Sequence, residues 1–196
     1  MSDNFQMLVD VGVSLDEASA LSDAIVAELR NHGLISGELT ADCVLGGVGY
    51  RPGPSLANLY KPRPREGRFW ELITSGVEPQ VGRSFNHWAL GPSCEGFTCP
   101  KCAASIEAFA PPFSDAMGDA IDDWLKGTDA AQLACPHCNQ TTRLTEWESK
   151  PALGFGNLSF RFWNWPRFDV PAWKIDVPAL VRRIAGHTVT STYGHL

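Results

Sequence analysis

The sequences CPKC (residues 99–102) and CPHC (residues 135–138) determine how the middle of this chain folds. In each, two residues separate the cysteines, a spacing at which one tight turn points both sulfurs toward the same place. Two such turns facing each other supply four thiolates in a tetrahedral arrangement, which is the ligand set of a structural zinc ion. We therefore predict one structural zinc ion per chain, held by Cys99, Cys102, Cys135 and Cys138.

Other uses of these cysteines fit the sequence less well. A redox-active C-x-x-C is the main rival, but two similar motifs suit a shared metal better. A catalytic zinc would need an open coordination position, and neither an H-E-x-x-H motif nor a His-rich ligand set is present. His137 lies inside a C-P-x-C turn, where it only flanks the metal. Cys94 precedes Cys99 by five residues, which matches no such turn, and Cys43 is expected to be a buried core thiol.

The two C-P-x-C turns resemble the knuckles of zinc-ribbon proteins, a likeness that covers roughly residues 94–145. The spacing departs from that class, because the 32 residues 103–134 separate the knuckles, where compact ribbons use about 15 to 20. This interval can hold a helix. We expect one that begins at Ser114 as N-cap, runs to about Lys126 and buries Met117, Ile121, Trp124 and Leu125 on one face.

The segment before the cysteines reads as a β-α-β unit. An apolar run over residues 8–13 predicts a strand, and residues 14–17 (SLDE) form a capping box that opens a helix. Gly33 marks the end of that helix. A second strand is expected over residues 43–50, where three glycines indicate a bulge or a close backbone approach.

The segment after the cysteines repeats this order. Residues 158–165 carry bulky side chains on both faces, which favours a central strand. Asp176 followed by Val177-Pro178 predicts a helix start, Gly186 its end, and residues 188–193 a closing strand.

These elements predict an α+β protein, a small ferredoxin-like or related α/β sandwich made of two β-α-β units. The core would comprise residues 1–93 and 146–196, with residues 94–145 as an inserted zinc ribbon carrying a helix. Between the first unit and the insert, residues 51–68 predict an extended Pro/Arg-rich loop, and residues 69–74 and 83–90 two further strands.

The composition narrows the function. A net charge of −6 disfavours sequence-independent nucleic-acid binding, which needs clustered Lys and Arg. The chain has neither an apolar run long enough for a membrane span nor the pattern of a signal peptide, so we expect a cytoplasmic protein. The G-x-S-x-G and P-loop motifs are also missing from the sequence. We therefore expect a protein that is not an enzyme.

Two charged segments are candidates for binding. The expected helix in the insert carries four acids opposite its apolar face: Asp115, Asp119, Asp122 and Asp123. These acids would suit a basic protein partner, with Trp124 as an anchor. The alternative is a nucleic-acid-associated zinc ribbon that contacts phosphates through Arg63, Arg65, Arg68 and Lys101. For each segment, an ordinary solvated surface is the competing interpretation.

In size, acidity, lack of catalytic motifs and a stabilised scaffold, the chain resembles the bacterial immunity proteins that neutralise nuclease toxins, such as those of type VI secretion. That resemblance implies an antitoxin that blocks the basic active or DNA-binding cleft of a toxin. The acidic helix would then be the part that enters the cleft.

Overall fold

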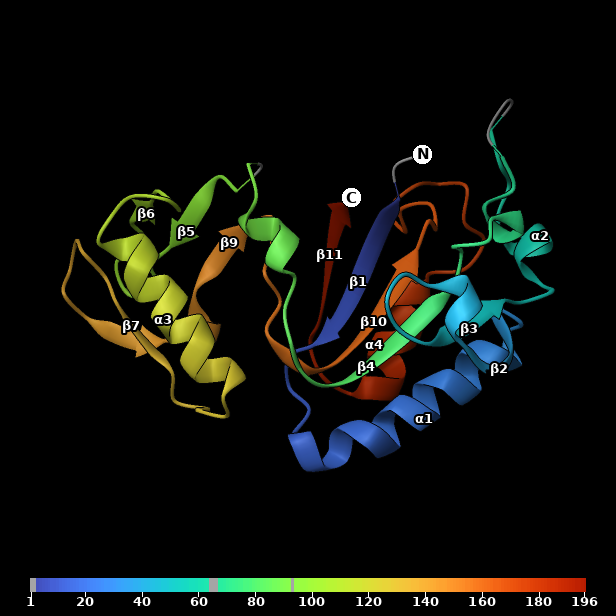
Figure 1. Cartoon of the computed structure of the whole chain (residues 1–196), viewed down its shortest axis with the longest axis horizontal. Coiled ribbons are helices and arrows are strands. Elements are labelled where there is room, and N and C mark those ends of the chain that lie inside the picture. The colour runs from blue at the N-terminus through green and yellow to red at the C-terminus, as the bar shows by residue number, and fades with distance from the viewer. Residues whose placement is uncertain (1–2, 64–66, 93) are drawn as a thin grey trace.

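The computed structural model describes residues 3–63, 67–92 and 94–196, and its centre is a six-stranded antiparallel sheet (Figure 1). The strand order is β11-β1-β10-β4-β3-β2. The bounds, in the same order, are Val189–His195, Asn4–Asp10, Gly156–Trp163, Val77–Ser84, Gly49–Pro52 and Ile35–Thr40. The protein is therefore of the mixed α+β class, as predicted, and β10 lies in the middle of the sheet.

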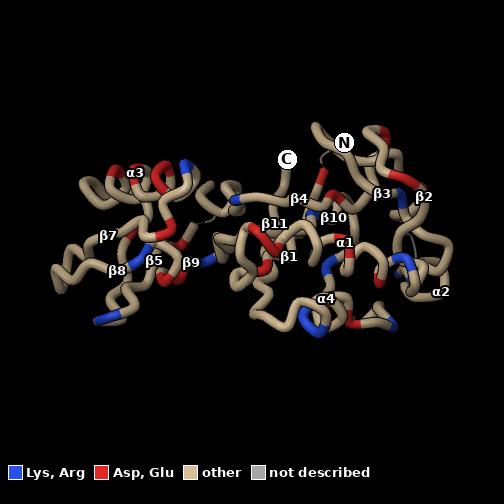
Figure 2. Tube along the Cα trace, turned by 90° about the horizontal axis from the view of Figure 1, so that it is seen from below, with Lys and Arg blue, Asp and Glu red and all other residues tan. Residues whose placement is uncertain are grey.

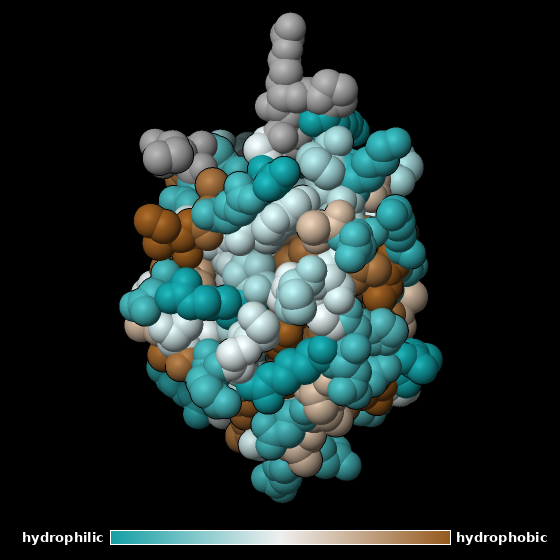
Figure 3. Space-filling view, turned by 90° about the vertical axis from the view of Figure 1, so that its right-hand side faces the viewer, coloured by the Kyte–Doolittle hydropathy of each residue, from teal (hydrophilic) through white to brown (hydrophobic). Residues whose placement is uncertain are grey.

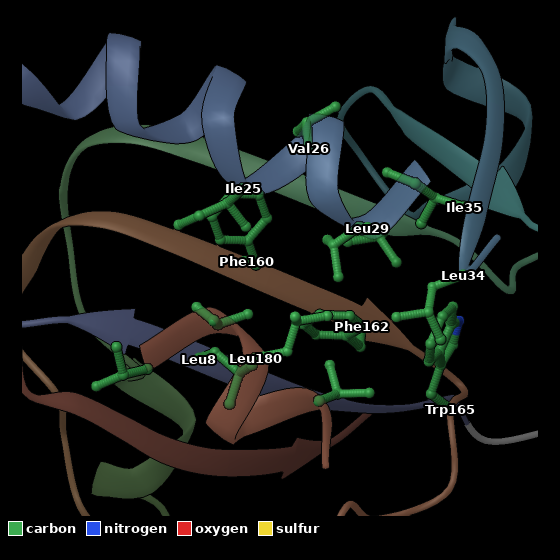
Figure 4. Packing of buried hydrophobic residues seen from close by; sticks show 14 of the residues in the cluster. Leu8, Ile25, Val26, Leu29, Leu34, Ile35, Phe160, Phe162, Trp165 and Leu180 are labelled. Atoms are coloured by element: carbon green, nitrogen blue, oxygen red, sulfur yellow. The ribbon is translucent and has the colours of Figure 1, made fainter. Parts of the chain in front are cut away.

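Helices α1 (Leu15–Asn31) and α4 (Val177–Ala185) pack on one face of this sheet. Figure 4 shows Ile25 and Leu29 of α1 pointing toward Phe160 and Phe162 of β10, with Leu180 of α4 beside them. Alternate residues of a strand share a face, so the two phenylalanines lie on the helix side. Their burial supplies much of the hydrophobic stabilisation of this layer.

Both helices begin and end where their sequence signals lie. Ser14 caps α1 by accepting a hydrogen bond from the Glu17 N–H, and Asp176 caps α4 through the Ala179 N–H at 2.8 Å. Gly33 and Gly186, which follow the two helices, have φ values of 65° and 69°. This left-handed conformation costs glycine little, so the predicted helix ends are confirmed.

The other face of the sheet is covered near β1 by the connection between β2 and β3. Met7 and Val9 of β1 pack there with Val44 and Cys43, and Cys43 is 1% exposed, as expected for a core thiol. Gly49 is the close approach that the glycine-rich sequence predicted, because a Cβ on it would lie 2.7 Å from the Val77 carbonyl oxygen. No larger residue fits at this position without a backbone shift.

Several predicted strand positions are wrong. Residues 8–13 extend past the true end of β1, because the Asp10 carboxylate accepts hydrogen bonds from the Gly12 and Val13 N–H groups and turns the chain. Residues 43–50 are mostly irregular and overlap only the start of β3, while β2 was missed. The prediction took β-branched residues of a covering loop for a strand.

The region before the insert also differs from its prediction. Residues 69–74 contain a 3-10 turn, Phe69–Glu71, and residues 83–90 contain only the end of β4 and a second 3-10 turn, η3 (His87–Leu90). Phe69 packs its ring against Tyr60, Trp70, Trp165 and Trp173, so its aromatic character serves a cluster rather than a strand. Within the predicted loop of residues 51–68 lies the short helix α2, Leu56–Leu59, and residues 64–66 fall outside the described part.

The chain between β4 and β10, residues 85–155, includes the predicted insert of residues 94–145, and from here on the whole of it is called the insert. It has its own hydrophobic cluster. Strands β5 (Gly96–Thr98), β6 (Ser105–Ile106) and β9 (Glu148–Lys150) form one small sheet, and β7 (Gln132–Ala134) pairs with β8 (Thr141–Arg143). Helix α3 (Phe113–Leu125) packs on one side of these strands and lies in front of them in Figure 1. It begins after Pro112 instead of at Ser114, since a proline with its fixed φ readily starts a helix.

The insert is attached to the large sheet at several points. Phe85 and Phe155, the first and last residues of the insert, follow β4 and precede β10, and their rings stack at a centroid distance of 5.2 Å. Asn86 donates its side-chain N–H groups to the Thr192 hydroxyl at 2.8 Å and to the Tyr193 carbonyl at 3.0 Å, both on β11. Because β11 is an edge strand, this side chain covers backbone that would otherwise lack a partner.

Among the described residues, none of the helices combines the length and apolar character needed to cross a membrane.

Candidate metal centre

The first knuckle lies at the turn between β5 and β6. The Cys99 N–H donates to the Ala104 carbonyl, the Ala103 N–H donates back to the Cys99 carbonyl, and both distances are 3.0 Å. The Lys101 N–H lies 3.4 Å from the Cys99 sulfur. Ala103 has a φ of 56°, which closes the turn at some conformational cost to alanine.

The second knuckle, between β7 and β8, repeats this geometry. The Cys135 N–H donates to the Gln140 carbonyl at 3.0 Å, and the Asn139 N–H donates to the Cys135 carbonyl at 2.9 Å. The His137 N–H again lies 3.4 Å from the first sulfur of its pair. Asn139 also has a φ of 56°, a conformation that asparagine adopts more readily than alanine. Two segments far apart in sequence thus adopt the same turn.

The two turns face each other and bring four sulfurs together. The Cys99 and Cys138 sulfurs are 3.9 Å apart, those of Cys102 and Cys135 are 3.8 Å apart, and all four lie within 4.8 Å of one another. A tetrahedron with metal–sulfur bonds of about 2.3 Å has sulfur–sulfur edges of about 3.8 Å. The spacing therefore fits a metal ion, and it is far longer than the disulfide bond length of about 2.05 Å.

The cluster affects its own ionisation. Burial opposes ionisation of Cys99, yet hydrogen bonds from the Cys102 and Lys101 N–H groups and from neighbouring thiols lower its pKa to about 7. The Ala104 N–H favours the thiolate of Cys102, but burial and the other three sulfurs raise the pKa of Cys102 to about 12. Of these two thiols, Cys99 is therefore the one that ionises more readily, and a bound cation would favour the thiolate form of Cys102.

The other thiols and imidazoles stand apart from this cluster. Neither Cys43 nor Cys94 belongs to the four-sulfur group, and both are free thiols. His137 contributes its backbone N–H to the second knuckle, and its ring is not part of the described ligand set. The signal that identified the ligands was their spacing, whereas the left-handed residue of the first knuckle, Ala103, left no signal in the sequence.

The chain matches no protein-family model, no curated protein and no solved structure with which it was compared. Its candidate functions therefore rest on the geometry alone.

The acidic residues predicted on the helix of the insert are brought together on one side of α3. Figure 2 shows acidic positions following one another along this helix. All four side chains are exposed: Asp115, Asp119, Asp122 and Asp123. The opposite side of the helix is buried through residues such as Met117 and Ile121. The helix is therefore fixed on one side and presents carboxylates on the other.

Two residues of α3 decide between predictions for its apolar face. Trp124 is 5% exposed and packs against Phe155 at a centroid distance of 5.1 Å, so its predicted place on the buried face is confirmed, and it offers no anchor at the surface. Leu125, expected to be buried, is 44% exposed. Leu125 is the last residue of α3.

The basic residues of the alternative hypothesis do not form one surface. Lys101 lies in the first knuckle, whereas the Pro/Arg-rich loop lies at the opposite end of the molecule, beside α2 (Figure 1). Arg68 pairs with Glu71 at 2.9 Å, and Arg65 falls outside the described residues. Figure 3, which views the end that carries α2, shows hydrophobic side chains in small patches separated by hydrophilic ones.

Proposed function

We propose that the four cysteines bind one structural zinc ion and that the insert is a zinc ribbon. Two β-hairpins whose turns carry matching C-P-x-C knuckles support this, as does the spacing of the four sulfurs. Thiolates bind zinc strongly, and four of them leave no coordination position for a substrate. The metal would stabilise a segment whose strands are only two or three residues long.

Metal analysis of the purified chain tests the zinc site. We expect about one zinc per chain. The Cys99→Ser/Cys138→Ser variant should lose both the zinc and the cooperative folding of the insert. Cys94→Ser is the matched control, since Cys94 lies outside the cluster, and it should retain the metal. A metal-free wild-type protein, prepared without chelator and with zinc in the medium, would contradict the proposal.

We propose further that the large sheet is an extended ferredoxin-like core. Four of its strands occur in the order β11-β1-β10-β4, all antiparallel. Helix α1 follows β1, and α4 connects β10 to β11, both on the same face. Strands β2 and β3 would then be an addition at the β4 edge, and the zinc ribbon an insertion between β4 and β10.

We infer that the protein is a non-enzymatic binding protein that presents α3 to a basic protein partner. The observation that carries this inference is the exposed row of four aspartates on a helix whose other side packs on the small sheets of the insert. A rigid acidic surface accelerates association with a basic one and selects that partner over others. A nuclease toxin has such a surface, because its cleft binds phosphates, so an immunity protein of the bacterial cytoplasm is the specific role we propose.

Charge reversal tests this role. The first step is to identify proteins that co-purify with the tagged chain from nuclease-treated lysate of its source, at moderate salt. With the identified partner, Asp119→Lys/Asp122→Lys should lower the association rate constant by about tenfold or more at low ionic strength. The control is Asp23→Lys/Glu38→Lys, which changes the net charge by the same amount at two exposed positions outside the insert.

Two results would count against the acidic surface. One is an association rate that is equal in both double variants. The other is recovery of nucleic acid without a protein when the nuclease step is omitted, which would favour the nucleic-acid hypothesis instead.

A further inference from the structure

The sheet face opposite α1 and α4 carries polar residues at its centre. On β4, Glu78 and Gln80 lie directly across from Arg161 and Ser159 of β10. Glu78 is 8% exposed and Ser159 is fully buried. Polar groups at such positions destabilise a fold unless each finds a hydrogen-bond partner.

Most of these groups do find partners. The Ser159 hydroxyl donates to the Gln80 side-chain oxygen at 3.1 Å, and its oxygen lies 3.0 Å from that of Ser84. The Glu78 carboxylate accepts hydrogen bonds from the Trp163 indole at 2.8 Å and from the Gln80 amide at 3.3 Å. The polar side chains around Arg161 therefore have hydrogen-bond partners.

Arg161 itself donates no hydrogen bond to any described residue, although its side chain is only 14% exposed. Its closest carboxylate oxygen, on Glu78, is 3.6 Å away, which is too long for a hydrogen bond. Its Nε is buried without a partner. The guanidinium lies over the rings of Phe5 and Trp163, at 5.1 and 5.3 Å from their centroids, which fixes its plane.

This guanidinium faces a groove of about 340 Å³. The walls include Arg83 and His87 as well as Gln80 and Ser84, and the described lining contains no carboxylate. Burial lowers the pKa of His87, and the charge of Arg161 lowers it further. Both arginines of the groove are ion-paired, Arg161 with Glu78 and Arg83 with Asp129. The groove is therefore distinguished by the hydrogen-bonding capacity that Arg161 leaves unused, and not by a net positive charge.

We propose that the groove binds a carboxylate group, which accepts hydrogen bonds from the Arg161 guanidinium. A planar guanidinium matches a carboxylate in shape and donates two parallel hydrogen bonds to it. Glu78 disfavours a doubly charged phosphate more than a singly charged carboxylate, because its own charge lies close to the site. The carboxylate belongs either to a small organic acid or to an acidic residue of a polypeptide. The carboxylate would contact neither the four-sulfur cluster nor a partner on α3.

Backbone amide NMR of the whole, zinc-loaded protein tests the site, with Ser84 and His87 as reporters. The probes are acetate for a free acid, N-acetylglutamate α-amide for a polypeptide side chain, and inorganic phosphate, each exchanged against chloride at constant ionic strength. We expect saturable shifts with at least one carboxylate, and weaker binding of phosphate. The tighter of the two carboxylates identifies the source.

Three variants decide which residue binds. Arg161→Lys keeps the charge but loses the planar fork and should bind about tenfold more weakly. Glu78→Gln keeps an acceptor for the Trp163 indole, removes the competing charge and should bind several-fold more tightly. Arg182→Gln, an exposed site on α4, should bind as the wild type does. Unchanged α1 amide resonances confirm that each variant is folded.

The proposal is overturned if neither carboxylate gives a saturable shift, if phosphate binds more tightly than both, or if Arg161→Lys and Glu78→Gln both bind like the wild type.

Discussion

Phenylalanine side chains differ widely in burial in this molecule, and two of them should differ accordingly in their effect on stability. Phe162 is 0% exposed under α1 and α4, whereas Phe109 is 56% exposed in the insert. We expect Phe162→Ala to lower the free energy of unfolding by about 3–5 kcal/mol. Phe109→Ala should change it by less than about 0.5 kcal/mol. Urea unfolding followed by tryptophan fluorescence measures both, and equal losses would contradict the assignment of the core.

The sequence identifies a functional residue when its role depends on residues that are close to it along the chain. The four cysteines were found because each pair is set by a spacing of three positions along the chain. Arg161 was not found, because its importance depends on Glu78, which is adjacent only through the pairing of β10 with β4. The one available signal was an arginine within a strand that is otherwise bulky on both faces.

Among the helices, α4 depends most visibly on a single capping side chain. Asp176 accepts the Ala179 N–H, and Pro178 occupies the first turn. We expect Asp176→Ala to cost about 1 kcal/mol of stability, because an N–H at the helix start loses its acceptor. Asp176→Asn retains an acceptor oxygen and should cost much less. Thermal unfolding of the two variants makes the comparison, and equal melting temperatures would argue against the cap.

Helices were predicted better than strands for a physical reason. The signals of α1 and α4 lie next to the ends of each helix, at Ser14, Gly33, Asp176 and Gly186, and do not depend on distant residues. Strand β4 was mostly missed because Glu78, Gln80 and Arg83 interrupt its apolar pattern. Those polar residues are stable there only because β10 and the insert supply their partners, which the sequence of β4 does not contain.

For the whole molecule, Arg83 is the clearest link between the sheet and the insert. Its side chain is 12% exposed and donates to the Trp124 carbonyl at 2.7 Å, to the Gly127 carbonyl at 3.1 Å and to the Asp129 carboxylate. Arg83→Gln should cost about 1.5–3 kcal/mol, since the charge-assisted hydrogen bonds of a largely buried guanidinium are lost.

Hydrogen exchange provides the measurement for this link. We expect faster exchange in the last turn of α3 in Arg83→Gln, with β1 and β10 unchanged. Arg143→Gln, an exposed arginine on β8, is the matched control and should leave exchange in α3 as it is. Equal exchange in both variants would show that Arg83 does not couple the two parts.

Metal affinity should depend on pH in a direction set by the thiols. The pKa of Cys99 is lowered to about 7, so as the pH falls through this value, protons compete for a sulfur that the metal needs. The raised pKa of Cys102, about 12, means that the metal must also displace a proton at neutral pH. We therefore expect the affinity for zinc to fall by at least about tenfold per pH unit between about pH 8 and pH 6. Competition with a chromophoric chelator measures this, and a pH-independent affinity would contradict a thiolate site.

The hydrogen bond from Asn86 to Tyr193 also bears on whether copies of the protein aggregate. An uncovered β11 would offer its backbone as a template for a strand of another copy. Asn86 lies at the start of the insert. We therefore expect that any loosening of the insert, including removal of the proposed zinc ion, uncovers that edge. Depletion of zinc should therefore appear first as turbidity that rises with protein concentration, before the large sheet itself unfolds.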